Sequence, residues 1–290
     1  MIYKVLVIKS SGILCYSKSF FGPDDIDDDF VSGFLTSILD ISQKIGGGEI
    51  SSLNFRNFNI IYSYDDEKYC IFLLITDNDD PEEEIGKLEL LQSEFINRFH
   101  EDLKNWDSDI GKFESFDDFV EKDIFIPPKI LLVGEDGVGK TSILNLFPGE
   151  LVIKLDEYLN AVIQKSIIFS DFREINECIL REINIREIVN NPKAYKRVFN
   201  TFDIVCLVTN SGATNLSKTQ KLYSLLKVKV KRADFYIIAN FQDLDKVSFK
   251  PEEIEKLFGV KTFGFSAKLP DAKANIYSII KEMLSSTFYD

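Results

Sequence analysis

The sequence predicts an α/β protein of two domains, a small α+β domain followed by a domain with a mostly parallel sheet and helices on both faces. With 290 residues, the chain is long enough for two hydrophobic cores. Residues 1–127 hold 27 acidic and 11 basic residues, a net charge of −16, whereas residues 128–290 hold 20 and 23, a net charge of +3. In that second part, strand-like apolar runs alternate with helical patterns, which is typical of parallel sheets.

Composition narrows the class of protein further. Hydrophobic residues make up 45% of the chain and charged residues 28%, and no run reaches the roughly 18–20 apolar residues that a membrane span needs. The first residues form a charged strand rather than a secretory signal, Ile2 stands where myristoylation requires glycine, and the last residues lack a prenylation cysteine. We therefore expect a cytoplasmic protein that reaches membranes only through partners. The acidic first domain argues against nucleic acid as a partner.

The cysteines are expected to be reduced core residues. They lie far apart, none is paired at metal-ligand spacing, and the chain has a single histidine, His100. The four are Cys15, Cys70, Cys178 and Cys206. Neither a structural disulfide nor a zinc site is expected from this pattern.

The first domain, residues 1–106, is expected to contain two strands, a helix, two more strands and a long helix. Strand-like alternation covers residues 2–8, 13–20, 51–64 and 68–76. The first helix begins at three aspartates and carries Phe30, Phe34, Ile38 and Ile41 at helical spacing, and the second begins at an acidic run after Pro81. Capping and solvation account for the carboxylates at these helix starts, so this domain shows no catalytic constellation.

Residues 107–128 connect the two domains. The segment carries Phe113, Phe116, Phe119 and Phe125, which is too apolar for a flexible tether. We expect it to pack as a short helix against one or both domains. The pair Pro127-Pro128 marks the entry to the second domain, residues 129–290.

The second domain opens with the run KILLVGEDGVGKTS, an apolar strand followed by a glycine-rich loop and a helix start. Gly134, Gly139, Lys140 and Thr141 fit the pattern G-x-x-x-x-G-K-[ST] of the phosphate-binding loop. The glycines allow backbone N–H groups to turn inward and hold an anion at a helix N-terminus. Lys140 would reach the terminal phosphates, and the Thr141 hydroxyl would bind Mg²⁺.

Two later strand ends indicate which base is bound. The apolar run at 235–239 ends in NFQDL, which contains Asn240 and Asp243, and the run at 260–265 leads into Ser266-Ala267-Lys268. An aspartate suits guanine, because its two oxygens can accept from the ring N1–H and the exocyclic amine together. Adenine offers no such pair of donors.

The order and spacing of these motifs resemble those of the Ras-like small GTPases, and NFQDL is most similar to the NKQDL of the Arf branch. The resemblance covers residues 129–290 and implies GTP or GDP with Mg²⁺ as cofactors. It implies that Asn240 ties the base loop to the phosphate loop and that the Ala267 N–H meets the guanine carbonyl. The expected nucleotide-binding residues are Gly134, Asp136, Gly137, Val138, Gly139, Lys140, Thr141, Ser142, Asn240, Phe241, Asp243, Ser266, Ala267 and Lys268. The expected metal-binding residues are Thr141 and Asp171.

The chain departs from this family in its switch segments. No threonine occurs between Ser142 and Ser170, so the residue that completes the Mg²⁺ shell in the family is absent. The family's D-x-x-G is matched at Asp171, with Glu174 replacing the glycine and Ile175 standing where the family has its water-positioning glutamine. The resemblance therefore implies no catalytic residue and very slow hydrolysis. Residues 171–203 run longer than in the family and are expected to form one or two helices.

Phe241 replaces the family's base-stacking lysine, and its ring is expected to stack on the base instead. The first domain resembles the longin/roadblock modules that bind GTPases in trafficking and signalling complexes, with a PAS-like sensor as the alternative. Together the two resemblances imply one chain in which a longin-like module accompanies a GTPase domain, similar to the longin and GTPase pairing in the signal-recognition-particle receptor.

The expected partners are the chain's own second domain, other longin/roadblock or GTPase-regulating proteins, and a second copy in a homo-oligomer. Two functions remain open. The first is a guanine-nucleotide-binding protein, at most a weak GTPase, in a trafficking-like or signalling assembly. The second is a pseudo-GTPase scaffold whose nucleotide site is weak or empty. A P-loop kinase is a distant third, because the guanine motifs have no place in it.

Overall fold

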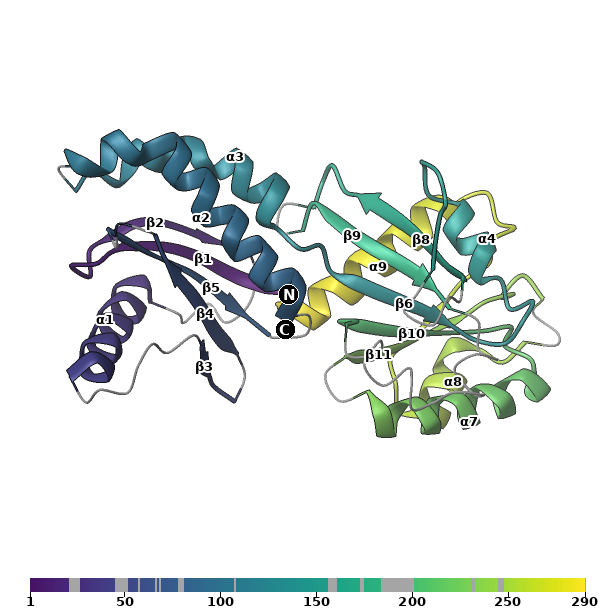
Figure 1. The fold of residues 1–290 in the computed structure, drawn as a ribbon. Coiled ribbons are helices and arrows are strands. Elements are labelled where there is room, and N and C mark those ends of the chain that lie inside the picture. Colours follow the sequence, from purple (N-terminus) through teal and green to yellow (C-terminus); the bar gives the residue numbers. More distant parts are fainter. Residues whose placement is uncertain are drawn as a thin grey trace. The chain divides into compact units, whose positions relative to one another are not determined.

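The computed structural model describes the chain except for residues 21–26, 45–51, 57, 66, 68, 78–80, 107, 156–160, 173–174, 184–200, 231–232, 245–247 and 290. The described residues form two compact units, Met1–Ile126 (unit 1) and Pro127–Asp290 (unit 2). Their ribbons are drawn in Figure 1. No helix within the described ranges has both the length and the apolar character needed to cross a membrane.

Unit 1 is built on a five-stranded antiparallel sheet in the order β2-β1-β5-β4-β3. The strands are β1 (Ile2–Lys9), β2 (Leu14–Ser19), β3 (Ser52–Asn54), β4 (Asn59–Tyr64) and β5 (Cys70–Thr76). β5 pairs with β1 on one side and β4 on the other, and all of its residues are buried. Its sequence CIFLLIT is apolar almost throughout because both faces of this strand are covered.

Helices cover both faces of this sheet (Figure 1). α1 (Asp28–Lys44) packs Val31 and Leu35 on the face that carries Leu73. α2 (Pro81–Lys104) packs on the opposite face, which carries Phe72. Successive side chains of a strand point to opposite faces, so each face receives its own hydrophobic cluster.

The buried face of α1 differs from the one expected from helical spacing. Phe30 and Ile41 were expected to face the core, but their side chains are 73% and 57% exposed. Val31 and Leu35 are buried in their place. Phe34 and Ile38, the other two residues of the expected stripe, are partly buried, so the covered face of α1 overlaps the expected one only in part.

The segment after α2 packs on the core of unit 1. It forms η1 (Ile110–Phe116), α3 (Asp117–Phe119) and η2 (Val120–Ile124). Phe113 and Phe116 are fully buried in the cluster that contains Phe95 of α2. The Tyr16 hydroxyl of β2 donates to Asp117 at 2.7 Å. The aromatic spacing that predicted a packed segment thus corresponds to part of the unit 1 core.

Unit 2 contains a seven-stranded sheet in the order β12-β11-β10-β6-β9-β8-β7. The strands are β6 (Lys129–Val133), β7 (Val152–Leu155), β8 (Ala161–Ile168), β9 (Glu177–Glu182), β10 (Ile204–Thr209), β11 (Asp234–Ala239) and β12 (Thr262–Gly264). The five strands from β12 to β9 pair in parallel, and β8 and β7 extend the sheet in antiparallel fashion. The mostly parallel sheet predicted for this part of the chain is confirmed.

The helices of unit 2 are α4 (Lys140–Asn145), α7 (Ala213–Lys229), α8 (Pro251–Phe258) and α9 (Ala272–Phe288). α7 and α8 pack Leu226 and Ile254 against Leu131 and Leu207 on one face of the sheet. On α9, Thr287 hydrogen-bonds to Tyr236 of β11, whose side chain lies on the other face. All four cysteines of the chain are buried, as expected of core residues.

The helices expected within residues 171–203 are not what the described part of that segment forms. Residues 177–182 are strand β9, which pairs in parallel with β6. Cys178 and Leu180 are buried and their neighbours in this strand are partly buried, a period of two that is typical of a strand and not of a helix. Residues 184–200, where further helix was expected, lie outside the described residues.

We predict that the stability of unit 1 depends on the ionisation of Glu84. Burial raises the pKa of Glu84 to about 7, although the Met1 ammonium and the Thr76 hydroxyl favour its charged form. Between the usual glutamate pKa of 4.5, which applies to the unfolded chain, and the raised pKa of about 7, the folded chain binds more protons than the unfolded chain. Stability should fall by roughly 3 kcal/mol as pH rises from about 4.5 to about 7, and it should level off once Glu84 is fully ionised above that range.

Urea unfolding followed through the fluorescence of Trp106, the chain's single tryptophan, measures this dependence. Glu84→Gln should flatten the profile, and Glu83→Gln, an exposed change of equal charge on the same helical turn, should not. An unchanged slope in Glu84→Gln would contradict the assignment.

Candidate functional site

The glycine-rich loop Gly134–Gly139 leaves the carboxyl end of β6 and leads into α4. β6 is the strand at which the chain order reverses across the sheet: β7, β8 and β9 lie on one side of it and β10, β11 and β12 on the other. In open parallel sheets, ligands bind beyond the carboxyl ends of the strands at such a switch point. The loop therefore lies where a ligand site is expected.

Two loop positions require glycine because neighbouring atoms leave no room for a side chain. A Cβ on Gly134 would lie 2.3 Å from the Val208 carbonyl oxygen, and one on Gly139 would lie 2.2 Å from the Asn240 side-chain nitrogen. Gly139 also has a φ of 101°, which other residues rarely adopt. The loop is therefore in close contact with the ends of β10 and β11.

Lys140 is buried at the start of α4, and its ammonium closes the loop from inside. It donates to the carbonyl oxygens of Gly134 at 2.9 Å and Glu135 at 3.0 Å. The Glu182 carboxylate lies 3.6 Å away and balances the charge. The same carboxylate accepts a hydrogen bond of 2.9 Å from the Thr141 hydroxyl.

Glu182 is a site residue that the sequence motifs did not identify. It is the last residue of β9, and the parallel register places it opposite Leu132, one residue before the end of β6. Carboxyl ends of neighbouring parallel strands meet at one edge of a sheet, so Glu182 falls beside the phosphate-binding loop. An acid at the end of the short apolar run ECILRE was the available signal.

Asp171, expected to bind the metal, does not lie at this edge. It sits in the turn between β8 and β9, which precedes β9 and so lies at the opposite end of that strand. There its carboxylate pairs with Lys281 of α9, which lowers the pKa of Asp171. The expectation was wrong because β8 is antiparallel to β9, and its carboxyl end therefore points away from the loop.

Ile175 likewise cannot stand where a GTPase orients its attacking water. It is fully buried just before β9, at the same distant end of the strand as Asp171. Glu174, expected in place of the glycine of D-x-x-G, lies outside the described residues.

Asn240 joins the loop that follows β11, called the base loop here (residues 240–244), to the phosphate-binding loop. It follows β11, and its side-chain nitrogen donates to the Val138 carbonyl oxygen at 2.9 Å. Its side-chain oxygen accepts from the Phe241 N–H at 2.8 Å. The residue is almost completely buried, with both ends of its amide engaged, so it fixes the two loops relative to each other.

Asp243 is held at the same edge of the sheet by the loop after β12. The Ser266 hydroxyl donates to one Asp243 oxygen at 2.7 Å and accepts from the Lys268 N–H at 3.3 Å. Asp243 is partly buried, and among the described residues no hydrogen bond involves its other carboxylate oxygen. The two strand ends named from sequence are therefore brought together.

The remaining expected residues sit around this frame. Phe241 is partly buried and has a φ of 65°, in the left-handed region, while Ala267 is partly buried in the loop after β12. Exposed positions on the phosphate-binding loop and at the start of α4 are Asp136, Gly137 and Ser142, and Lys268 is exposed beside Ala267.

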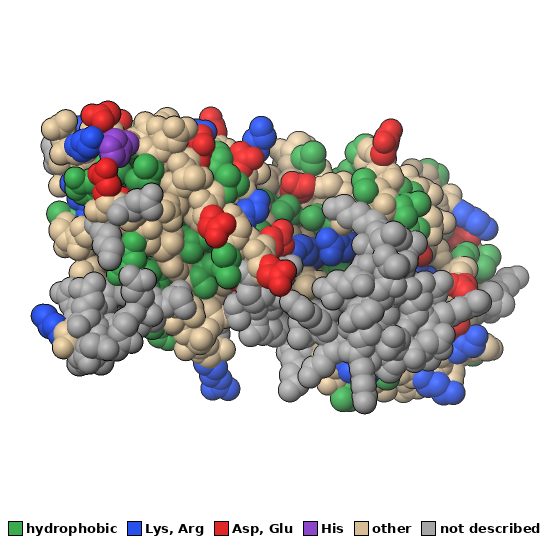
Figure 2. All heavy atoms as spheres, in the orientation of Figure 1, with side chains coloured by type: hydrophobic (Ala, Val, Ile, Leu, Met, Phe, Trp, Pro, Cys, Tyr) green, Lys and Arg blue, Asp and Glu red, His purple; other side chains and the backbone are tan. Residues whose placement is uncertain are grey.

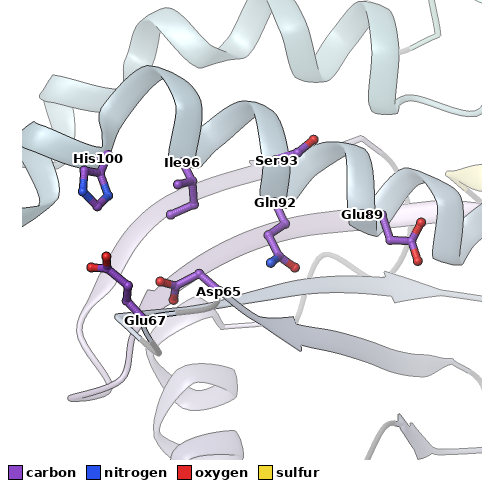
Figure 3. Close-up of a pocket in the computed structure, with 7 residues that line it drawn as sticks. All are labelled: Asp65, Glu67, Glu89, Gln92, Ser93, Ile96 and His100. Atoms are coloured by element: carbon purple, nitrogen blue, oxygen red, sulfur yellow. The ribbon is translucent and has the colours of Figure 1, made fainter.

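Unit 1 has a hollow of its own, about 390 Å³ in volume (Figure 3). It lies between α2 and the turn after β4, and is lined by Asp65, Glu67, Glu89, Gln92, Ser93, Ile96 and His100. Figure 2 shows acidic and apolar side chains together on this face, beside the single histidine. Within the described ranges, no cluster of three or more histidine, cysteine or acidic side chains is arranged to hold a metal ion.

We predict that Gly139→Ala destabilises unit 2 more than Gly149→Ala. Both positions have a positive φ, 101° and 89°, so both changes strain the backbone by about 1–3 kcal/mol. Only at Gly139 would the new methyl displace Asn240, because no atom lies within 4 Å of a Cβ on Gly149. Thermal unfolding followed by circular dichroism measures the difference, and equal losses would show that the contact with Asn240 is not a constraint.

The comparisons with known proteins support no relationship at the level of sequence. No model of a known protein family matches the chain, and no curated protein matches it. Among solved structures, the chain is similar to the cytosolic domain of the T. maritima FeoB iron transporter in a GMPPNP form, at 15% identity with a TM-score of 0.43. It is similar to the GDP form at 15% identity and a TM-score of 0.44.

These matches cover 55% and 57% of this chain and 64% and 65% of the two structures, so the chain spans less than two thirds of their length. Such a distant likeness bears on no residue or activity. The loop motif, the switch point and the mostly parallel sheet of unit 2 themselves describe an α/β fold with a phosphate-binding-loop motif at its switch point.

Proposed function

We propose that unit 2 binds a guanine nucleotide together with Mg²⁺ and turns over GTP very slowly. The observation that carries this proposal is the hydrogen bond of 2.9 Å from Asn240 to Val138. It joins an anion-binding loop to the strand end that bears Asp243. Backbone N–H groups of the loop would hold the phosphates, and the Asp243 carboxylate would accept from guanine N1–H and its exocyclic amine.

The residues present fit a magnesium ion. Thr141 and Glu182 place a hydroxyl and a carboxylate oxygen 2.9 Å apart at the loop. Mg²⁺ at nucleotide sites takes one or two carboxylates together with phosphate oxygens, so this donor set suits it. When bound, the ion would neutralise charge on the phosphates. Lys140 would keep its tether to the loop carbonyls and contribute a positive charge beside the same phosphates.

Slow turnover follows from what the sequence lacks, whether the D-x-x-G motif is aligned at Asp171 or at Glu182. Counted from Glu182, the strand-end motif reads E-I-N-I and is followed by Arg186, so the glycine and the water-positioning glutamine are again absent. No threonine occurs between Ser142 and Ser170. Each missing group that orients water or senses the γ-phosphate costs orders of magnitude in rate. We therefore propose a module that retains its nucleotide.

A second function, a scaffold with a weak or empty site, is favoured by one observation. The Glu182 carboxylate contacts both Lys140 and Thr141, so the two side chains that would meet phosphate and metal already have a partner within the chain. A nucleotide must displace or share this carboxylate, which lowers its net affinity.

For unit 1 we propose a longin-like interaction module in a trafficking-like or signalling assembly. Its order of two strands, a helix, three strands and a helix agrees with the expected order apart from the extra strand β3. The helices on both faces of its antiparallel sheet support the proposal (Figure 1). An experimental structure with another strand order in residues 1–126 would overturn it.

The proposed function is tested on protein as purified, by denaturing it and identifying any released nucleotide by ion-exchange chromatography. We expect GDP or GTP in stoichiometric amounts.

Asp243→Ala should weaken GDP binding at least about tenfold, because two guanine donors lose their acceptor. Asp271→Ala, which removes an exposed carboxylate of the same unit, should bind as the wild type does. A wild-type protein that carries no nucleotide and binds none with Mg²⁺ would point to the scaffold.

We predict that, of the two acids considered as metal ligands, only Glu182 affects the dependence of GDP release on Mg²⁺. Glu182→Gln should raise the Mg²⁺ concentration needed to slow GDP release by about tenfold, since it removes a charged ligand. Asp171→Asn should leave that concentration unchanged, because Asp171 lies in the turn at the other end of β9. A loss of Mg²⁺ dependence in Asp171→Asn alone would refute the placement.

A further inference from the structure

Ser211 stands out among the residues that touch the base loop without belonging to its motif. It follows β10, is fully buried, and has a φ of 62°. A non-glycine residue rarely adopts such a conformation unless its surroundings hold it there. Its position beside Asn240 suggests that the strained turn serves the loop that follows β11.

The Ser211 side chain is bonded on both sides to the base loop. Its hydroxyl donates to the Asn240 carbonyl oxygen at 2.7 Å and accepts from the Gln242 side-chain nitrogen at 2.9 Å. Its own carbonyl oxygen accepts from the Phe249 N–H at 2.9 Å. One buried serine therefore fixes the start of the base loop and the segment that follows it.

Ser211 is itself anchored to the first turns of α7. Its N–H donates to the Thr209 hydroxyl at 3.2 Å, which in turn donates to the Asn215 side-chain oxygen at 2.7 Å. The Asn210 N–H donates to the same Asn215 oxygen at 3.0 Å. A buried polar network whose members are all paired is rigid, so it transmits the position of α7 to Ser211.

We infer that Ser211 is a positioning residue for guanine recognition, an inference that rests on the function proposed for unit 2. Its hydroxyl sets the backbone of Asn240. That backbone determines where the Asn240 amide meets the phosphate-binding loop and where Asp243, three residues on, presents its carboxylate. A shift of this turn would weaken recognition of the base without disrupting the sheet.

The test compares GDP with IDP, whose base lacks the exocyclic amine, by competition against a fluorescent GDP analogue. Ser211→Ala removes the hydroxyl, and Ser211→Gly removes it while suiting the positive φ. Both variants should weaken GDP binding by about tenfold and IDP binding less, so that the preference for GDP over IDP falls. The matched control is Thr262→Val, which removes a buried hydroxyl bond at the start of β12, to the Val260 carbonyl oxygen.

The outcomes separate the inference from the proposed function. Equal weakening of GDP and IDP, or an unchanged preference in Ser211→Gly, would show that Ser211 has a structural role only. A preference that falls in Thr262→Val as well would assign the effect to general loss of stability. A wild-type protein that binds neither nucleotide would refute the proposed function, and the inference with it.

Discussion

The hydrogen bond between the Asn240 amide and the Val138 carbonyl is the interaction on which the proposed nucleotide site depends. It spans two strand ends separated by about a hundred residues of chain and exists only because Gly139 has no side chain to occupy the same space. Each end of the Asn240 amide is bonded, and the residue is buried, so its polar atoms are satisfied within the protein. The loops proposed for phosphate binding and base recognition are therefore joined in one arrangement.

The direction of the strands decides which acid belongs to this arrangement. Asp171 and Glu182 are separated by the single strand β9, yet only Glu182 reaches the phosphate-binding loop. In a parallel sheet the carboxyl ends share an edge, whereas the turn between two antiparallel strands lies at the opposite edge. A glutamate is also one methylene longer than an aspartate, which allows its carboxylate to contact Thr141 and Lys140 at once.

Unit 1 is organised by a different principle, the burial of aromatic rings. Phe95 of α2 contacts Phe113 and Phe116 with ring centroids 5.2 and 5.0 Å apart, distances typical of favourable aromatic pairs. Arg98 lies over the rings of Phe116 and Phe119 and covers them from solvent. These contacts make the segment after α2 part of the core, so this apolar connecting sequence is a packed element and not a flexible linker.

The sequence by itself determined the local features of this protein: the glycine-rich loop, the strand-end motifs at Asn240 and Ser266, the alternation of strands and helices that predicted a mostly parallel sheet, and the apolar segment 107–128 that was expected to pack. Each follows from nearest neighbours in the chain, because glycine conformations and hydrophobic periods are local properties. Only the tertiary structure decided that Glu182 rather than Asp171 lies at the site, that residues 177–182 form a central strand, and that Val31 rather than Phe30 faces the sheet. These depend on strand direction and on which partner covers a face, and neither is encoded within a few residues of the position it affects.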